Sequence, residues 1–108
     1  ATMKLRELCE ICDVPRRAVQ GYEKLGLVKP AGKNEQGHLL YDEYARHRID
    51  EIRLLQKMGF SLKEICQLID LEPEQKKQQI NRQIEVLREE EIRIEQTIRQ
   101  ALSMYYGL

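Results

Sequence analysis

Two adjacent arginines, Arg16 and Arg17, open a short segment whose residue types and spacing suit contact with DNA. Pro15 precedes them, and proline fits the first turn of a helix, where its missing N–H group costs nothing. The basic pair then lies at the N-terminal end of this helix, the end that a recognition helix points at base edges. Gly26 follows the last periodic residue and predicts the end of the helix.

Positive charge is concentrated on this segment, although the whole chain of 108 residues has a formal net charge of zero. Residues 16–34 carry five basic side chains and a single acid, Glu23. Residues 35–71 carry five basic and seven acidic side chains, and residues 72–108 carry six and seven. The excess of positive charge therefore lies where phosphate contacts need it. The alternative is a solvated basic surface.

A second short helix is predicted before the basic one. Residues 4–12 place Leu5, Leu8, Cys9 and Cys12 at helical spacing, on one apolar stripe. Only residues 13–15 separate the two predicted helices. A helix, a tight turn and a basic helix form the pattern of a helix-turn-helix unit.

The segment after Pro30 predicts a β-hairpin. Residues 31–37 form a polar loop rich in turn residues, and Leu39–Tyr41 follows as a short strand. We expect Leu27 and Val28 to form the partner strand. Two short strands around a glycine-containing loop make a hairpin, which in this setting is a wing.

Two further helices are predicted before residue 71. From Asp42 to Met58, Ala45, Ile49, Ile52 and Leu55 recur at helical spacing, and Gly59 ends that helix. Ser61 and Glu64 then have the spacing of a capping box, which predicts the start of a helix over residues 62–70.

A long helix is predicted over residues 75–105, because Pro73 lies in its first turn and no later glycine or proline interrupts it. Apolar residues repeat every seven positions, as at the a and d positions of a coiled coil. This seam consists of Ile80, Ile84, Leu87, Ile94, Ile98, Ala101 and Tyr105, and only Glu91 interrupts it. So long a stripe predicts a homodimer. The alternative is a helix packed back within one monomer.

The three cysteines are predicted to be core residues. Cys9 and Cys12 have a spacing that also suits a metal or redox site, but no second pair of cysteines or histidines completes a metal-binding set. Cys66 falls on one helical stripe with Leu62, Ile65 and Ile69. Since free cysteine packs as a small hydrophobic residue, we predict no metal and no cofactor.

Other functional classes find little support in the sequence. The two histidines are isolated, and no catalytic constellation or glycine-rich phosphate loop is present, so we predict no enzyme and no catalytic residue. No apolar run is long enough to span a membrane, and the N-terminus has no signal-peptide pattern. We expect a cytoplasmic protein without a membrane partner.

In combination, these motifs resemble the MerR family of bacterial transcription regulators. The start Met3-Lys4-Leu5-Arg6-Glu7-Leu8 is similar to the family's start, and Val14, Arg17, Tyr22, Gly26, Leu27 and Pro30 match its reading helix and exit. Gly37 and Tyr41 match the wing, and Gly59-Phe60-Ser61-Leu62 with Glu64 and Ile65 matches a later segment. The resemblance implies a mainly α fold. It also implies a winged helix-turn-helix DNA-binding domain (residues 1–71) followed by a dimerisation helix (residues 72–108) that forms an antiparallel coiled coil.

The resemblance implies a sequence-specific regulator that acts as a homodimer on a palindromic promoter operator in double-stranded DNA, with RNA polymerase as a further candidate partner. We expect Arg17 and Gln20 to contact base edges. Candidates for phosphate contact are Arg16, Tyr22, Lys33 and Tyr41, with His38 in the wing.

Several family positions differ in this chain. Gln20-Gly21 replaces an Arg-Tyr pair, His38-Leu39 replaces Tyr-Arg in the wing, and Ala45-Arg46 replaces Asp-Leu. An alternative is therefore a MerR-like protein-interaction module, such as a chaperone modulator, that does not read DNA. Family members usually carry a sensor segment after the coiled coil. Only residues 103–108 remain here, so either the chain senses nothing by this route or a C-terminal part is missing from it.

Overall fold

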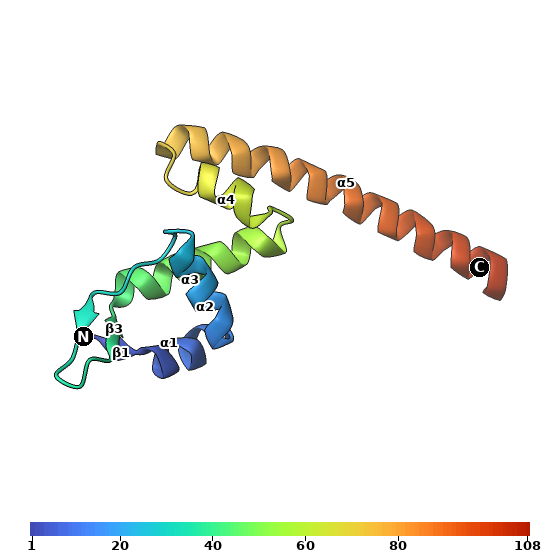
Figure 1. Cartoon of the computed structure of the whole chain (residues 1–108). Helices are drawn as coiled ribbons and strands as arrows, with labels where there is room; N and C mark the ends of the chain where they lie inside the picture. Colours follow the sequence, from blue (N-terminus) through green and yellow to red (C-terminus); the bar gives the residue numbers. More distant parts are fainter. The chain divides into compact units, whose positions relative to one another are not determined.

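The computed structural model describes all of residues 1–108 (Figure 1). It contains five helices and three short strands. They are β1 (Met3–Lys4), α1 (Leu5–Cys12), α2 (Arg16–Lys24), β2 (Gly32–Lys33), β3 (Leu39–Tyr41), α3 (Glu43–Lys57), α4 (Leu62–Leu68) and α5 (Pro73–Tyr106). The chain divides into two units, residues 1–66 and 67–108. The predicted mainly helical fold is confirmed, whereas the predicted domain boundary after residue 71 stays a prediction.

The turn between α1 and α2 is closed by backbone hydrogen bonds. Asp13 adopts a left-handed conformation with φ 53°, and the Val14 N–H group donates to the Cys9 carbonyl oxygen at 3.0 Å. Pro15 is the N-cap of α2, one position earlier than predicted. The Gly26 and Leu27 N–H groups donate to the carbonyl oxygens of Glu23 and Tyr22, both at 2.9 Å. This pattern is a Schellman motif, and Gly26 with φ 76° ends the helix as predicted.

The wing has a different strand partner from the predicted one. β3 is the central strand of a three-stranded antiparallel sheet, in the order β1-β3-β2. Leu40 lies opposite Gly32 on one side and opposite Lys4 on the other. The predicted pairing of Leu27 and Val28 with β3 is wrong. These two side chains are buried, but their backbone belongs to the turn that leaves α2.

Side-chain caps begin the next two helices. The Asp42 carboxylate accepts the Ala45 N–H group at 2.9 Å at the start of α3. At the start of α4, the Ser61 N–H group donates to the Glu64 carboxylate at 2.9 Å and the Glu64 N–H group donates to the Ser61 hydroxyl at 3.1 Å. The predicted capping box is thereby confirmed. These hydrogen bonds also lower the pKa of the Glu64 carboxyl group.

Apolar side chains from both helices of the helix-turn-helix unit, from the turns and from α3 fill the core. The most deeply buried large side chains are Leu8, Val19, Tyr41, Ile49, Ile52, Leu55 and Ile65. No polar or charged residue is buried. Since every charge stays near water, burial of apolar area is the main term that stabilises this unit.

Helix α5 runs without interruption from Pro73 to the left-handed Gly107, whose φ is 68° (Figure 1). At a rise of about 1.5 Å per residue this helix is roughly 50 Å long. The long helix predicted over residues 75–105 is confirmed. Neither α5 nor any shorter helix combines the length and the hydropathy that a membrane span requires.

Gly21 in the interior of α2 weakens this helix, and a methyl group added there meets no atom within 4 Å. We therefore expect Gly21→Ala to raise the free energy of unfolding by about 0.5–1 kcal/mol, because alanine loses less backbone entropy on folding. Urea denaturation followed by circular dichroism measures the change. Gly26→Ala is the matched control and is expected to destabilise the chain, since Gly26 has φ 76°. A loss of stability in both variants would contradict this account.

Candidate nucleic-acid interface

The outward face of α2 carries mainly basic and neutral polar side chains. Arg16, Arg17, Gln20 and Lys24 are all exposed, whereas Val19 and Tyr22 point into the core. Because Arg16 is the first helical residue, both arginines lie in the first turn, as predicted. The face thus combines planar hydrogen-bonding groups with positive charge, as contact with a polyanion requires.

Glu23, the one acid between residues 16 and 34, is held against the wing. Its carboxylate accepts a hydrogen bond from the hydroxyl of Tyr41, a fully buried residue of β3. Burial raises the pKa of the Tyr41 phenol, and the Glu23 carboxylate raises it further. The phenol therefore stays protonated and remains a donor. This hydrogen bond occupies the only negative group of the segment.

Tyr22 anchors α2 to α3 in a similar way. Its ring is only 3% exposed, and its hydroxyl donates to the Gln56 side-chain oxygen at 2.8 Å. A phosphate contact needs an accessible hydroxyl, and neither Tyr22 nor Tyr41 offers one in this structure. In this structure the two hydroxyls hold α2 in place, and phosphate contact by Tyr22 or Tyr41 stays a prediction.

Arg48 provides a third anchor that the sequence analysis missed. Its Nε group donates to the Leu27 carbonyl oxygen at 2.7 Å and thereby holds the turn after α2. Arg48, Ile52 and Gln56 are spaced by four residues along α3 and share one face of it. Polar residues on both sides of a buried isoleucine were the available signal for these anchors.

The wing tip is organised by Asn34. Its side-chain oxygen accepts the N–H groups of Gln36 at 3.0 Å and His38 at 2.9 Å, and its own N–H group donates to the His38 carbonyl oxygen at 3.0 Å. Gly37 with φ 82° completes the turn. Lys33 and His38 are both exposed, so the wing presents a basic group and an imidazole to solvent.

A hollow of about 380 Å³ brings the wing tip to the start of both helices of the helix-turn-helix unit. It is lined by Lys4, Leu5, Arg6, Arg16, Gly37, His38 and Leu39. The structure therefore joins Arg16 and His38, two predicted site residues, and adds two cations that the sequence analysis missed. Arg17 does not line this hollow, and Gln20 lines another one, with Glu23 and Lys24.

The cysteine pair of α1 does not form a metal-binding cluster. Cys9 and Cys12 are half-buried, and no group of three or more His, Cys, Asp or Glu side chains gathers anywhere in the structure. Cys12 lies with its sulfur 3.9 Å from the Arg46 carbonyl oxygen. Burial, with a further contribution from Asp50, raises the pKa of the Cys12 thiol to about 11. Its thiolate, the form that binds metals, is therefore disfavoured.

Cys66 corrects the prediction of three core cysteines, because its side chain is exposed. Ile65 is fully buried, and the next residue of a helix is rotated by about 100° from it. Cys66 therefore faces solvent, although its spacing from Leu62 and Ile69 had suggested that it lies on their apolar stripe.

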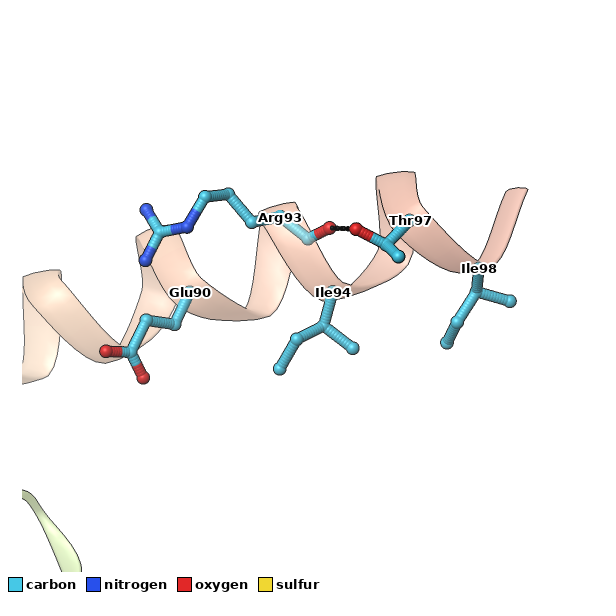
Figure 2. Close-up of a pocket in the computed structure, with 5 residues that line it drawn as sticks. All are labelled: Glu90, Arg93, Ile94, Thr97 and Ile98. Atoms are coloured by element: carbon cyan, nitrogen blue, oxygen red, sulfur yellow. Dashed lines mark hydrogen bonds between the residues drawn. The ribbon is translucent and has the colours of Figure 1, made fainter. Parts of the chain in front are cut away.

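The second predicted surface, the seam of α5, differs between its two halves. Ile80, Ile84 and Leu87 are half-buried, whereas Ile94, Ile98 and Tyr105 are 60%, 53% and 76% exposed. A shallow hollow of about 520 Å³ lies along the exposed half (Figure 2). Figure 2 shows Ile94 and Ile98 on the same side of the helix, with Thr97 turned away and its hydroxyl donating to the Arg93 carbonyl oxygen at 2.9 Å.

Thiol labelling tests the burial of the cysteine pair. At pH 8 we expect a maleimide to modify Cys66 first, because this residue is exposed, while Cys9 and Cys12 react at least about tenfold more slowly, since burial raises the pKa of both thiols. Peptide mass spectrometry measures the three rates. In Cys66→Ser the fast phase should disappear. Fast modification of Cys12 at pH 8 would contradict the structure.

Removal of a helix anchor is expected to lower stability. Tyr22→Phe keeps the buried ring and deletes only the hydrogen bond to Gln56, so the free energy of unfolding should fall by about 1 kcal/mol. Tyr44→Phe removes the hydroxyl of a tyrosine that is 72% exposed and should leave stability unchanged. Chemical denaturation compares the two variants. Equal effects would show that the Tyr22 hydroxyl does not anchor α2.

Comparison with known proteins places this arrangement among regulators. A family model described as "MerR HTH family regulatory protein" matches residues 3–72, and a second, "MerR, DNA binding", matches residues 46–106. The mercuric resistance operon regulatory protein of Bacillus cereus is 35% identical over 69 residues, which are 62% of this chain and 52% of that protein. The chain spans little more than half the length of such curated relatives.

Two solved structures have the same fold over almost the whole chain. A MerR-family transcriptional regulator from Bacillus cereus matches with a TM-score of 0.72 and 30% identity, over 99% of this chain and 84% of that one. HiNmlR, described as a MerR family regulator lacking the sensor domain and bound to promoter DNA, matches with a TM-score of 0.78 and 17% identity, over 99% and 87%. The second likeness concerns the fold alone.

Proposed function

Because this chain belongs to the MerR family of helix-turn-helix regulatory proteins, we propose that it is a transcription regulator that reads a palindromic promoter operator as a homodimer. Residues 1–71 form the DNA-binding part of this proposal, and residues 72–108 form the dimerisation helix. RNA polymerase at the promoter is the further partner we propose. The operator is double-stranded DNA, the partner that a basic helix beside a wing suits best.

The outward face of α2 carries the proposal. It presents Arg16, Arg17, Gln20 and Lys24, while Glu23 is held by Tyr41. An α-helix fits the major groove of B-DNA, and its exposed side chains then meet base edges and phosphates. An acidic protein surface would also attract this basic face, but the combination of a basic helix with a wing favours the grooves of DNA.

We assign two different roles to the exposed residues. Arg17 and Gln20 are the proposed readers of base edges, since arginine pairs bidentately with guanine and glutamine with adenine. Arg16, Lys33 and His38 are the proposed phosphate contacts, which fix the position of the protein but carry no sequence information. Arg16 and His38 line one hollow, which supports a contact of both with the same stretch of backbone.

Dimerisation would explain the palindromic operator. A two-fold axis places two copies of α2 in equivalent positions, and half-sites on DNA then repeat with the same symmetry. The exposed half of the seam on α5 supports a second copy as the partner, because a monomer leaves Ile94, Ile98 and Tyr105 in water. We propose an antiparallel coiled coil for this contact.

Single substitutions separate base reading from phosphate contact. We expect Arg17→Ala to weaken the preferred operator by about 1–3 kcal/mol and to relax discrimination at one base position in each half-site. Lys33→Ala should weaken all sequences equally and reduce the salt slope by about one phosphate per protomer. Competition assays with single-base variants of the promoter upstream of the gene measure both effects.

The outcomes distinguish the competing functions. A uniform loss of affinity in Arg17→Ala would make Arg17 a phosphate contact and leave Gln20 as the reader. Tyr44→Phe is a control that should bind as the unmodified chain does. Salt-independent or absent binding to the promoter would favour the protein-interaction module instead. The replacement of family contact residues at Gln20-Gly21 and His38-Leu39 is also consistent with that alternative.

A further inference from the structure

One flank of the α5 seam carries opposite charges at positions one heptad apart. Arg88 and Glu95 lie on one flank, one heptad apart, and Glu90 and Thr97 lie on the other. In the single chain, Arg88 pairs with Glu85 at 3.7 Å and Glu95 pairs with Arg99 at 3.8 Å. All four of these side chains are at least 63% exposed, so both ion pairs contribute little to stability. Arg88 and Glu95 can therefore exchange these partners for others.

We propose that Arg88 of each copy pairs with Glu95 of the other copy. These two ion pairs fix the register of the homodimer and favour self-association over pairing with other chains. The inference rests on the proposed homodimer and adds its register and its specificity. Charged residues that flank a coiled-coil seam set partner choice and orientation in general. The occupant of the exposed seam is thus a second copy of this chain.

The apolar residues alone favour the same register. In an antiparallel pair, each a residue packs opposite a d residue of the partner. The register that pairs Arg88 with Glu95 also places four seam pairs opposite each other: Ile80 with Tyr105, Ile84 with Ala101, Leu87 with Ile98 and Glu91 with Ile94. Each exposed C-terminal half then covers the half-buried N-terminal half of the other copy, and no seam residue is left without a partner.

Charge repulsion disfavours the neighbouring registers. A shift by one heptad in one direction places Arg88 opposite Arg88 and Glu90 opposite Glu90 of the second copy. A shift in the other direction places Glu95 opposite Glu95. Like charges at such flanking sites destabilise a pair, so of these three registers only the proposed one is free of them.

The same register accounts for Glu91, the residue that interrupts the seam. Arg88 lies one turn before Glu91 on the same face of α5, at a spacing that brings two helical side chains together. In the proposed dimer Arg88 lies between its own Glu91 and the second copy's Glu95. A carboxylate near the two-fold axis therefore has a cation beside it, which a buried charge requires.

Charge exchange tests the register on the full chain. Arg88→Glu alone and Glu95→Arg alone should each weaken self-association about tenfold, because both ion pairs become repulsions. An equimolar mixture of the two variants should form heterodimers above the statistical half, since each mixed pair again joins opposite charges. The double variant R88E/E95R should regain self-association. Native mass spectrometry and sedimentation velocity at low salt measure all three, and the preference should fade at high salt.

Arg82→Glu and Glu89→Arg are the matched controls. Both residues lie on the face of α5 opposite the seam and carry the same charge changes, so their mixture should form heterodimers at the statistical half. The same half for R88E with E95R would overturn the proposed register, while a dimeric wild-type chain would still stand. A wild-type chain that sediments as a monomer would instead overturn the homodimer of the proposed function.

Discussion

The hydrogen bond from the Tyr41 hydroxyl to the Glu23 carboxylate joins the two parts of the candidate interface. It ties the central strand of the wing to the last turn of α2, so the wing and the helix keep a common orientation. It also engages the only acidic side chain of the basic segment. Because the tyrosine is buried, the pKa of its phenol is raised and the donor is retained over the whole physiological pH range. This one contact therefore affects both the orientation and the charge of the interface.

Two further contacts make the position of α2 over-determined. Gln56 accepts the Tyr22 hydroxyl, and Arg48 donates to the carbonyl oxygen of Leu27 in the turn after the helix. Both partners lie on one face of α3. A helix that is held in its last turn and in the turn that follows can carry Gly21, a residue that weakens it, without losing its place. The exposed side chains of α2 are thus presented by a rigid support.

Signals from adjacent residues predicted most of the fold. The features that depend on contacts between distant residues were not predicted. Pro15 and Gly26 marked the ends of the basic helix because caps depend on adjacent residues. The strand pairing depended on distant contacts instead. Leu27 and Val28 have the composition of a strand, but the Schellman turn and Arg48 hold them in another conformation, and the two-residue partner Gly32–Lys33 has no apolar pattern at all.

The candidate site shows the same division. Arg16, Arg17 and Gln20 are exposed where helical periodicity places them outside the core, whereas Lys33 and His38 are exposed because they lie in the wing. The burial of Tyr22 and Tyr41 was not predictable, because an amphipathic ring suits both a surface and a core and only the positions of Gln56 and Glu23 decide between them. Lys4 and Arg6 were missed because the fold, not the sequence, brings them to the wing.

Arg46 illustrates how a departure from the family pattern is accommodated. It occupies a position where the resemblance implies leucine, and its Nε group is buried without a hydrogen-bond partner. Its outer nitrogen reaches Glu43 at 3.3 Å, and its backbone carbonyl lies beside Cys12. An unpaired buried donor costs about 1–3 kcal/mol, but only this one nitrogen is buried, since the Arg46 side chain as a whole is 40% exposed. Arginine suits such a position because its long apolar stem can cover apolar surface while the guanidinium group stays near water.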